Sequence, residues 1–77
     1  MERFPVASGR EVISALERAG FEVVSQRGSH VKLKRVTPER TLIAIVPVHP
    51  ELARKTLTSI LKQANLTIEE FRELFWL

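Results

Sequence analysis

The chain is predicted to adopt an α+β fold with the element order α-β-β-β-α-α. Residues near both ends show the apolar spacing of amphipathic helices, and residues 21–46 between them show strand patterns. Three antiparallel strands with the helices on one face leave the other face of the sheet open. With 77 residues, of which 44% are hydrophobic, the chain is expected to form one domain over residues 1–77.

The first helix is predicted to begin after Ser8 and to stop at Gly20. Ser8 and Glu11 have the spacing of a capping box, in which each side chain accepts a hydrogen bond from the other residue's backbone N–H. Gly20 suits the left-handed conformation that often ends a helix. The helix is expected to bury a stripe made of Val12, Ile13, Leu16 and Ala19.

Three strands are predicted between the helices. The first covers residues 21–26, with Phe21 and Val23 on one face, and the second runs from His30 to about Val36. Between these two strands, residues 27–29 form a turn. The continuous apolar run of residues 42–46 predicts the third strand, preceded by a turn at Pro38 and closed by Pro47.

Two helices are predicted in the remainder of the chain. Residues 56–64 carry an apolar stripe, and Asn65 can end that helix in the left-handed conformation. A second capping box, formed by Thr67 and Glu70, opens a shorter helix. The side chains expected to face inward are Leu57, Ile60, Leu61, Ala64, Ile68, Phe71, Leu74 and Phe75. For Trp76 and Leu77 both core packing and a docking site for a partner stay open.

The most informative tract is residues 27–34. Its two-residue alternation directs Val31 and Leu33 into the core and places His30, Lys32 and Lys34 on the open face. A histidine exchanges protons readily near neutral pH, so His30 between basic side chains is a candidate acid–base group on a phosphate-binding surface. From the pattern alone, an ordinary surface histidine is the more common interpretation. Gly28 is expected to serve either a tight turn or a close backbone approach to a ligand.

Positive charge is concentrated in the middle of the chain. Residues 27–55 contain seven basic and two acidic residues, a net charge of +5. Residues 1–26 contain three basic and four acidic residues, and residues 56–77 contain two basic and three acidic ones, so each flank has a net charge of −1. A focused positive field attracts polyanions, nucleic acids first among them. A merely solvated basic region is the alternative.

Other classes of protein are disfavoured by composition. The absence of cysteine excludes a disulfide framework and a thiolate metal site, and agrees with the expected cytoplasmic localisation. No apolar run has the length of a membrane span, and the N-terminus lacks the layout of a signal peptide. His30 and His49 are the only imidazoles, and no carboxylates stand at ligand-like spacing, so neither a metal nor another cofactor is predicted.

Several motifs, in this order and spacing, resemble the HicA family of small toxins from bacterial toxin–antitoxin pairs. They are Ser8-Gly9-Arg10-Glu11-Val12, Ala19-Gly20-Phe21-Glu22-Val23-Val24, Arg27-Gly28-Ser29-His30-Val31, Val46-Pro47-Val48-His49, Thr56-Leu57, Ile60-Leu61-Lys62-Gln63-Ala64 and Leu66-Thr67-Ile68-Glu69-Glu70-Phe71. The resemblance implies a fold similar to the double-stranded RNA-binding domain, cleavage of messenger RNA, and His30 as the active-site histidine. It also implies a HicB-like antitoxin, which we expect to cover the His30 face. One departure is Lys55, which stands where members of the family often have glycine.

Metal-independent cleavage of RNA fits these residues, because RNA supplies its own nucleophile, the 2′-hydroxyl. His30 is expected to act as base or acid, with His49 as a second-ranked rival. The predicted RNA-binding residues are Arg27, Gly28, Ser29, Lys32, Lys34, Arg54 and Lys55. A non-catalytic RNA-binding module of the same fold is the alternative, and the Gly-Ser-His turn is the feature that such a binder does not require. A DNA-binding module lacks a convincing recognition helix.

Overall fold

The computed structural model describes residues 4–77, and its elements follow the predicted order. They are α1 (Gly9–Arg18), β1 (Glu22–Arg27), β2 (His30–Val36), β3 (Thr41–Pro47), α2 (Arg54–Ala64) and α3 (Ile68–Phe75). The α+β prediction is therefore confirmed. In the described part of the chain, no helix has the length and apolar character needed to cross a bilayer.

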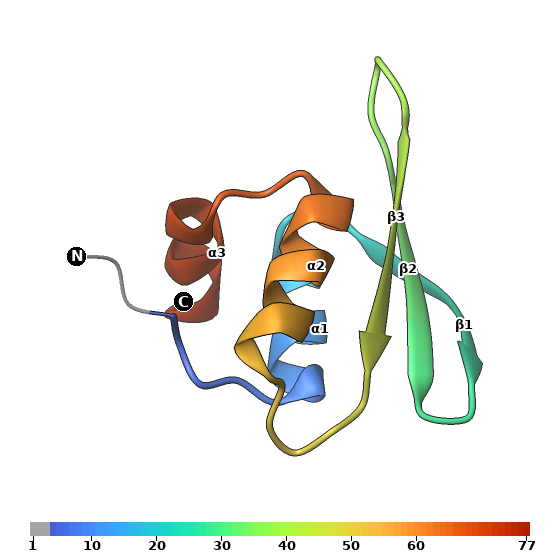
Figure 1. Cartoon of the computed structure of the whole chain (residues 1–77). Helices are drawn as coiled ribbons and strands as arrows, with labels where there is room; N and C mark the ends of the chain where they lie inside the picture. The colour runs from blue at the N-terminus through green and yellow to red at the C-terminus, as the bar shows by residue number, and fades with distance from the viewer. Residues whose placement is uncertain (1–3) are drawn as a thin grey trace.

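The elements form three layers. The sheet has the order β1-β2-β3, and both neighbouring pairs are antiparallel. In Figure 1, α1 and α2 cover one face of the sheet, and α3 lies beyond them on the side away from the strands. The guanidinium of Arg18 donates a 2.9 Å hydrogen bond from Nη1 to the carbonyl oxygen of Leu74, which ties α3 to α1. The opposite face of the sheet is left open, as predicted.

The hydrophobic core lies between the sheet and the helices. From the strands come Val31 and Leu33 of β2, both buried, and α3 contributes the fully buried ring of Phe71. The predicted stripe of α2 is buried throughout. Of the stripe predicted for the first helix, Ile13 on α1 and Ala19 directly after it are only half-buried. Phe75 also packs partly buried against this core. Trp76 and Leu77, for which two interpretations stayed open, are 69% and 78% exposed.

Local signals define most helix ends. In the first capping box, Ser8 N–H donates to Glu11 Oε1 at 2.8 Å and Glu11 N–H donates to Ser8 Oγ at 3.1 Å. The second box forms in the same way around Thr67. Asn65 ends α2 with a φ of 57°, as predicted. The start of α2 differs from the prediction, because the helix begins at Arg54 rather than at residue 56.

The first strand is more exposed than its apolar residues suggest. It begins at Glu22 rather than at Phe21, and although Phe21 is buried, Val23 is 46% exposed. Two features account for this exposure. β1 is an edge strand that pairs only with β2, and its register shifts between Val23 and Ser25, which marks a bulge.

The start of α1 is fastened to the segment that follows β3. Gly9 is buried there, and its N–H donates a 2.9 Å hydrogen bond to the carbonyl oxygen of His49. A Cβ on Gly9 would collide with the carbonyl oxygen of Pro47. Only glycine therefore allows the helix to begin this close to the loop that leads from β3 to α2.

Candidate functional site

A two-residue turn, Gly28-Ser29, joins β1 to the start of β2. Gly28 has a φ of 59°, and Ser29 lies outside the left-handed region, so a glycine stands at the first central position, as type II′ hairpin turns require. No atom lies within 4 Å of where a Cβ on Gly28 would sit. The positive φ shows that the turn itself needs a glycine here, and a close backbone approach to a ligand stays a prediction.

Hydrogen bonds hold the turn from two sides. The side-chain amide of Gln26 donates from Nε2 to the carbonyl oxygen of Gly28 at 3.0 Å. The backbone N–H of Val48 donates to the carbonyl oxygen of Ser29 at 2.6 Å. The next residue, His30, follows this fastened turn and is paired in the sheet with Arg27 and Pro47. A role for backbone N–H groups near Gly28 in binding phosphate stays a prediction.

His30 lies on the open face, in a shallow hollow. It is aligned with Arg27 of β1 and Pro47 of β3, while the next open-face residue of β2, Lys32, is aligned with Ser25 and Ile45. The hollow measures about 390 Å³, and its lining consists of Ser25, Arg27, His30, Lys32 and Ile45. Three of the predicted site residues, Arg27, His30 and Lys32, therefore share one concave surface.

Lys34 lies one step further along β2, outside the lining of that hollow. Its side chain is exposed on the same face, as predicted, and its strand partners are Glu22 and Ile43. The neighbouring carboxylate of Glu22 makes the potential around Lys34 less positive than that around Lys32. Among the predicted lysines of β2, Lys32 is the one whose position best suits a phosphate beside His30.

Arg54 and Lys55 lie in the first turn of α2, at the same end of the molecule as the β1–β2 turn (Figure 1). The guanidinium carbon of Arg54 is 4.1 Å from the centroid of the Phe4 ring, in cation–π geometry. Lys55 is exposed and has an ordinary helical backbone with a negative φ. A glycine is therefore not required at this position, and Lys55 leaves an extra cation near a helix N-terminus.

His49 serves the fold through its backbone. Its carbonyl oxygen accepts the hydrogen bond from Gly9, and its own N–H donates to the carbonyl oxygen of Pro47 at 3.0 Å. The imidazole of His49 is exposed and does not line the hollow that contains His30. The ranking of His49 behind His30 as a catalytic candidate stays a prediction.

Two residues of the hollow, Ser25 and Ile45, were not predicted from the sequence. Both lie opposite Lys32, so only the register of three paired strands brings them to His30. Ile45 is further positioned from α2, because its backbone N–H donates to Gln63 Oε1 at 2.9 Å. No single-strand pattern signals these contacts, whereas a correct strand pairing predicts them.

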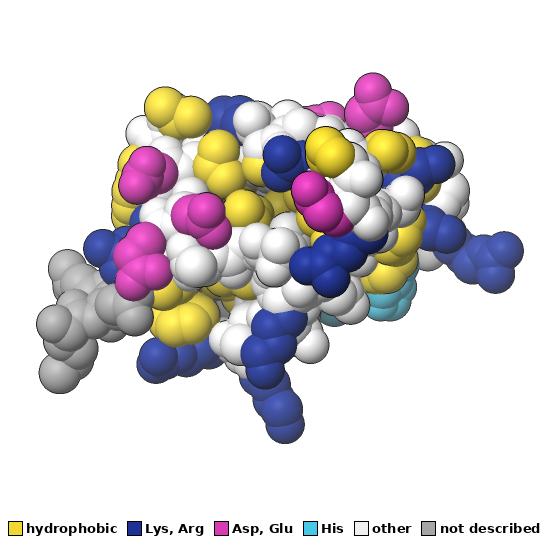
Figure 2. Space-filling view, turned by 90° about the horizontal axis from the view of Figure 1, so that it is seen from above, with side chains coloured by type: hydrophobic (Ala, Val, Ile, Leu, Met, Phe, Trp, Pro, Cys, Tyr) yellow, Lys and Arg dark blue, Asp and Glu magenta, His cyan; other side chains and the backbone are white. Residues whose placement is uncertain are grey.

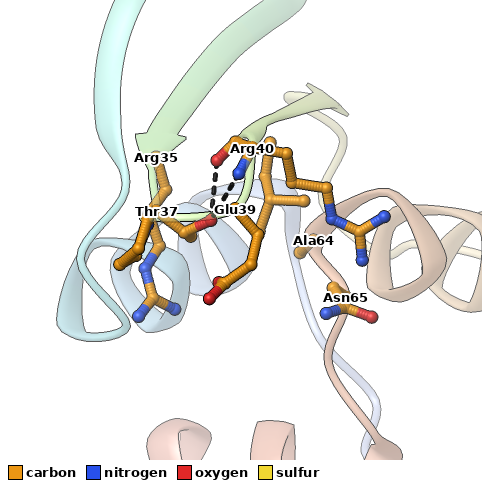
Figure 3. A pocket seen from close by; sticks show the side chains of 8 residues that line it. Arg35, Thr37, Glu39, Arg40, Ala64 and Asn65 are labelled. Atoms are coloured by element: carbon orange, nitrogen blue, oxygen red, sulfur yellow. Dashed lines mark hydrogen bonds between the residues drawn. The ribbon is translucent and has the colours of Figure 1, made fainter.

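A larger hollow of about 660 Å³ lies at the opposite end of the β2–β3 hairpin, beside the C-terminal end of α2 (Figure 3). Arg35 and Arg40 line it together with the carboxylate of Glu39, and no histidine takes part. Thr37 braces this hairpin end, since its Oγ1 donates to the carbonyl oxygen of Arg40 at 2.7 Å and accepts from the Arg40 N–H at 3.0 Å. Acid–base chemistry near neutral pH is better served at His30.

The hollow around His30 contains cations and an imidazole but no carboxylate. Across residues 4–77, no three side chains of histidine, cysteine, aspartate or glutamate are grouped in a way that would hold a metal ion. Arg27 and Lys32 can neutralise a phosphate in this hollow, and His30 can transfer a proton.

Comparison with known proteins identifies the family of the chain. No curated protein matches the chain. A family model described as the HicA toxin of bacterial toxin–antitoxin systems matches residues 9–66, which is more than half of the chain and includes the turn, His30 and all three strands. The chain therefore belongs to the HicA family, the toxins of bacterial toxin–antitoxin systems, and an antitoxin is its partner.

Proposed function

We propose that the protein is an endoribonuclease toxin that cleaves messenger RNA, with His30 as the acid–base group. The observation that carries this proposal is the imidazole of His30 beside Arg27 and Lys32 in one hollow of the open sheet face. Membership of the HicA family supports it, since it makes the chain a toxin.

The chemistry follows from the groups in the hollow. The 2′-hydroxyl of the RNA attacks the adjacent phosphorus and loses its proton, the bond to the 5′-oxygen breaks, and that oxygen gains a proton. His30 accepts the first proton or donates the second. Arg27 and Lys32 neutralise the charge that builds up on the phosphate oxygens in the transition state. Magnesium prefers carboxylate oxygens as protein ligands, and the lining of the hollow provides none.

Residues outside the hollow extend the RNA path. Lys34 continues the basic row of β2, and Lys55 adds a cation at the end of the molecule where the turn lies. Arg54, which lies against Phe4, is expected to contribute less than Lys55. Ser29 and the backbone near Gly28 are expected to donate hydrogen bonds to phosphate oxygens.

A histidine substitution with a matched control tests the proposal. His30→Ala should abolish cleavage of messenger RNA by the purified protein and the growth arrest caused by its expression. His49→Ala should retain both, because its exposed imidazole lies outside the hollow. The free energy of unfolding of each variant should lie within about 0.5 kcal/mol of the wild-type value, as is usual for substitutions at exposed positions. Wild-type cleavage rates in His30→Ala would contradict the catalytic assignment.

A non-catalytic RNA-binding module is the second candidate. Within residues 4–77 no hydrogen bond orients the His30 imidazole, whereas catalytic imidazoles are usually held by a second group. If the wild-type protein binds RNA and leaves it intact, and His30→Ala retains that binding, this second function is the correct one.

The partner is proposed to be a HicB-like antitoxin that covers the His30 face. An acidic surface on the antitoxin would be steered towards Arg27 and Lys32 and would block the RNA path by occupying it.

A further inference from the structure

A separate hollow lies on the side of the molecule away from the sheet. It measures about 370 Å³, and its walls are Phe4 and Pro5 from the N-terminal segment and Arg72 and Trp76 from the end of α3. Figure 1 shows that α3 lies on the far side of α1 and α2 from the strands. All four residues fall outside the 9–66 range of the family match.

The guanidinium of Arg72 contains an unpaired hydrogen-bond donor. Its Nη1 atom is shielded from solvent and has no hydrogen-bond partner among residues 4–77, although buried donors are nearly always paired. An unpaired buried donor is costly, and the cost is greater for a charged group. Arg72 as a whole is only partly buried and lines the hollow, so a carboxylate that enters the hollow can pair with its guanidinium through a charge-assisted hydrogen bond.

The surroundings of Arg72 are apolar and exposed. Trp76 presents most of its indole to solvent, and its ring meets that of Phe75 edge-on at a centroid distance of 4.8 Å. The hydrogen bond between Arg18 and Leu74 fastens the end of α3 to α1, so the backbone that carries this indole is held in place. We use the name Trp76 surface for the four residues that line this hollow, Phe4, Pro5, Arg72 and Trp76.

Charge selects the kind of molecule that can bind there. The helix that carries Arg72 also carries Glu69, Glu70 and Glu73. Acidic side chains gather over the α3 side of the molecule in Figure 2. A field of this sign repels the phosphate backbone of RNA. This repulsion is large for a polyanion with many phosphates, whereas a single carboxylate can still pair with the guanidinium of Arg72 at hydrogen-bond distance. The occupant is therefore inferred to be a protein segment with one carboxylate for Arg72 and apolar side chains that pack on Trp76.

We propose that the Trp76 surface is a second docking site for the antitoxin, separate from the His30 face, and that it binds a segment with a carboxylate between apolar residues. The proposal rests on the antitoxin partner that the family implies, but not on RNA cleavage. Tryptophan and arginine are the residue types most enriched among those that dominate binding energy at protein interfaces. A contact here adds affinity without occupying the RNA path.

Titration calorimetry with the cognate antitoxin tests the proposal. Arg72→Met and Trp76→Ala should each weaken antitoxin binding by about tenfold or more, the loss expected when a central arginine or tryptophan anchor is removed. The matched controls are Arg10→Met, an exposed arginine on α1, and Val36→Ala, an exposed apolar residue at the end of β2. Both controls should bind the antitoxin as the wild type does.

The outcomes separate this proposal from the proposed function. Equal affinities for the wild type, Arg72→Met and Trp76→Ala would overturn the docking site, even if all three proteins cleave RNA. If the wild type leaves RNA intact while Arg72→Met and Trp76→Ala bind the antitoxin more weakly than it does, only the ribonuclease assignment is overturned. Two further results would also overturn the docking site. One is weaker RNA binding by Trp76→Ala, and the other is self-association of the chain that Trp76→Ala removes.

Discussion

The 2.6 Å hydrogen bond from the N–H of Val48 to the carbonyl oxygen of Ser29 joins the β1–β2 turn to the segment that follows β3. His30 comes directly after Ser29, and its strand partner Pro47 comes directly before Val48. The candidate catalytic residue is therefore held at a point where the backbone is fastened on both sides. The segment after Pro47 is itself fastened to α1 by the hydrogen bond from Gly9 to His49.

Gly28→Ala should destabilise the protein because its Cβ is strained at a φ of 59°. The expected loss is about 1 kcal/mol, the cost of placing a residue with a Cβ in the left-handed region. There is ample space for the added methyl group, so no steric clash contributes. Urea denaturation measures the difference, with Ser29→Ala as the control because Ser29 lies outside the left-handed region. Equal stability of the two variants would show that the conformation of Gly28 is not needed.

RNA affinity should fall with increasing salt, because each contact between a lysine and a phosphate releases counterions. Lys32→Gln should reduce the magnitude of the log–log salt slope by about 0.7 for single-stranded RNA. Lys62→Gln is the matched control, since Lys62 is exposed in the last turn of α2, at the end away from Arg54 and Lys55. Fluorescence anisotropy at several salt concentrations gives both slopes. Identical slopes for the two variants would contradict RNA binding at the basic row of β2.

Binding of the antitoxin should shield the open sheet face. Lys32 and Lys34 are exposed in the free chain, so both should react with an acetylating reagent, and both should be protected in the complex. Mass spectrometry of the digested protein measures the extent of acetylation, and Lys62 serves as the internal reference. Protection limited to α2 and α3, with Lys32 still reactive, would mean that the antitoxin does not act by occlusion of the His30 face.

Several features of the site depend only on residues close together in the chain, and the sequence alone predicts them. The capping box between Ser8 and Glu11 involves residues one helical turn apart, so its pattern is complete within four positions. The alternation along β2 likewise decides that Val31 faces the core whenever His30 faces solvent. The turn before His30 was expected for the same reason, since a glycine marks a backbone that other residues rarely adopt.

Other features required the tertiary structure, because they join residues far apart in the chain. The register of three strands brings Ser25 and Ile45 to Lys32, and the bulge after Val23 is visible only against β2. The same is true of Gly9, whose lack of a side chain matters because Pro47 lies against it. Nothing in the sequence distinguishes Arg72 from an arginine whose side chain is fully solvated. The Nη1 of Arg72 is unpaired because the fold shields that atom from water while residues 4–77 supply no acceptor for it.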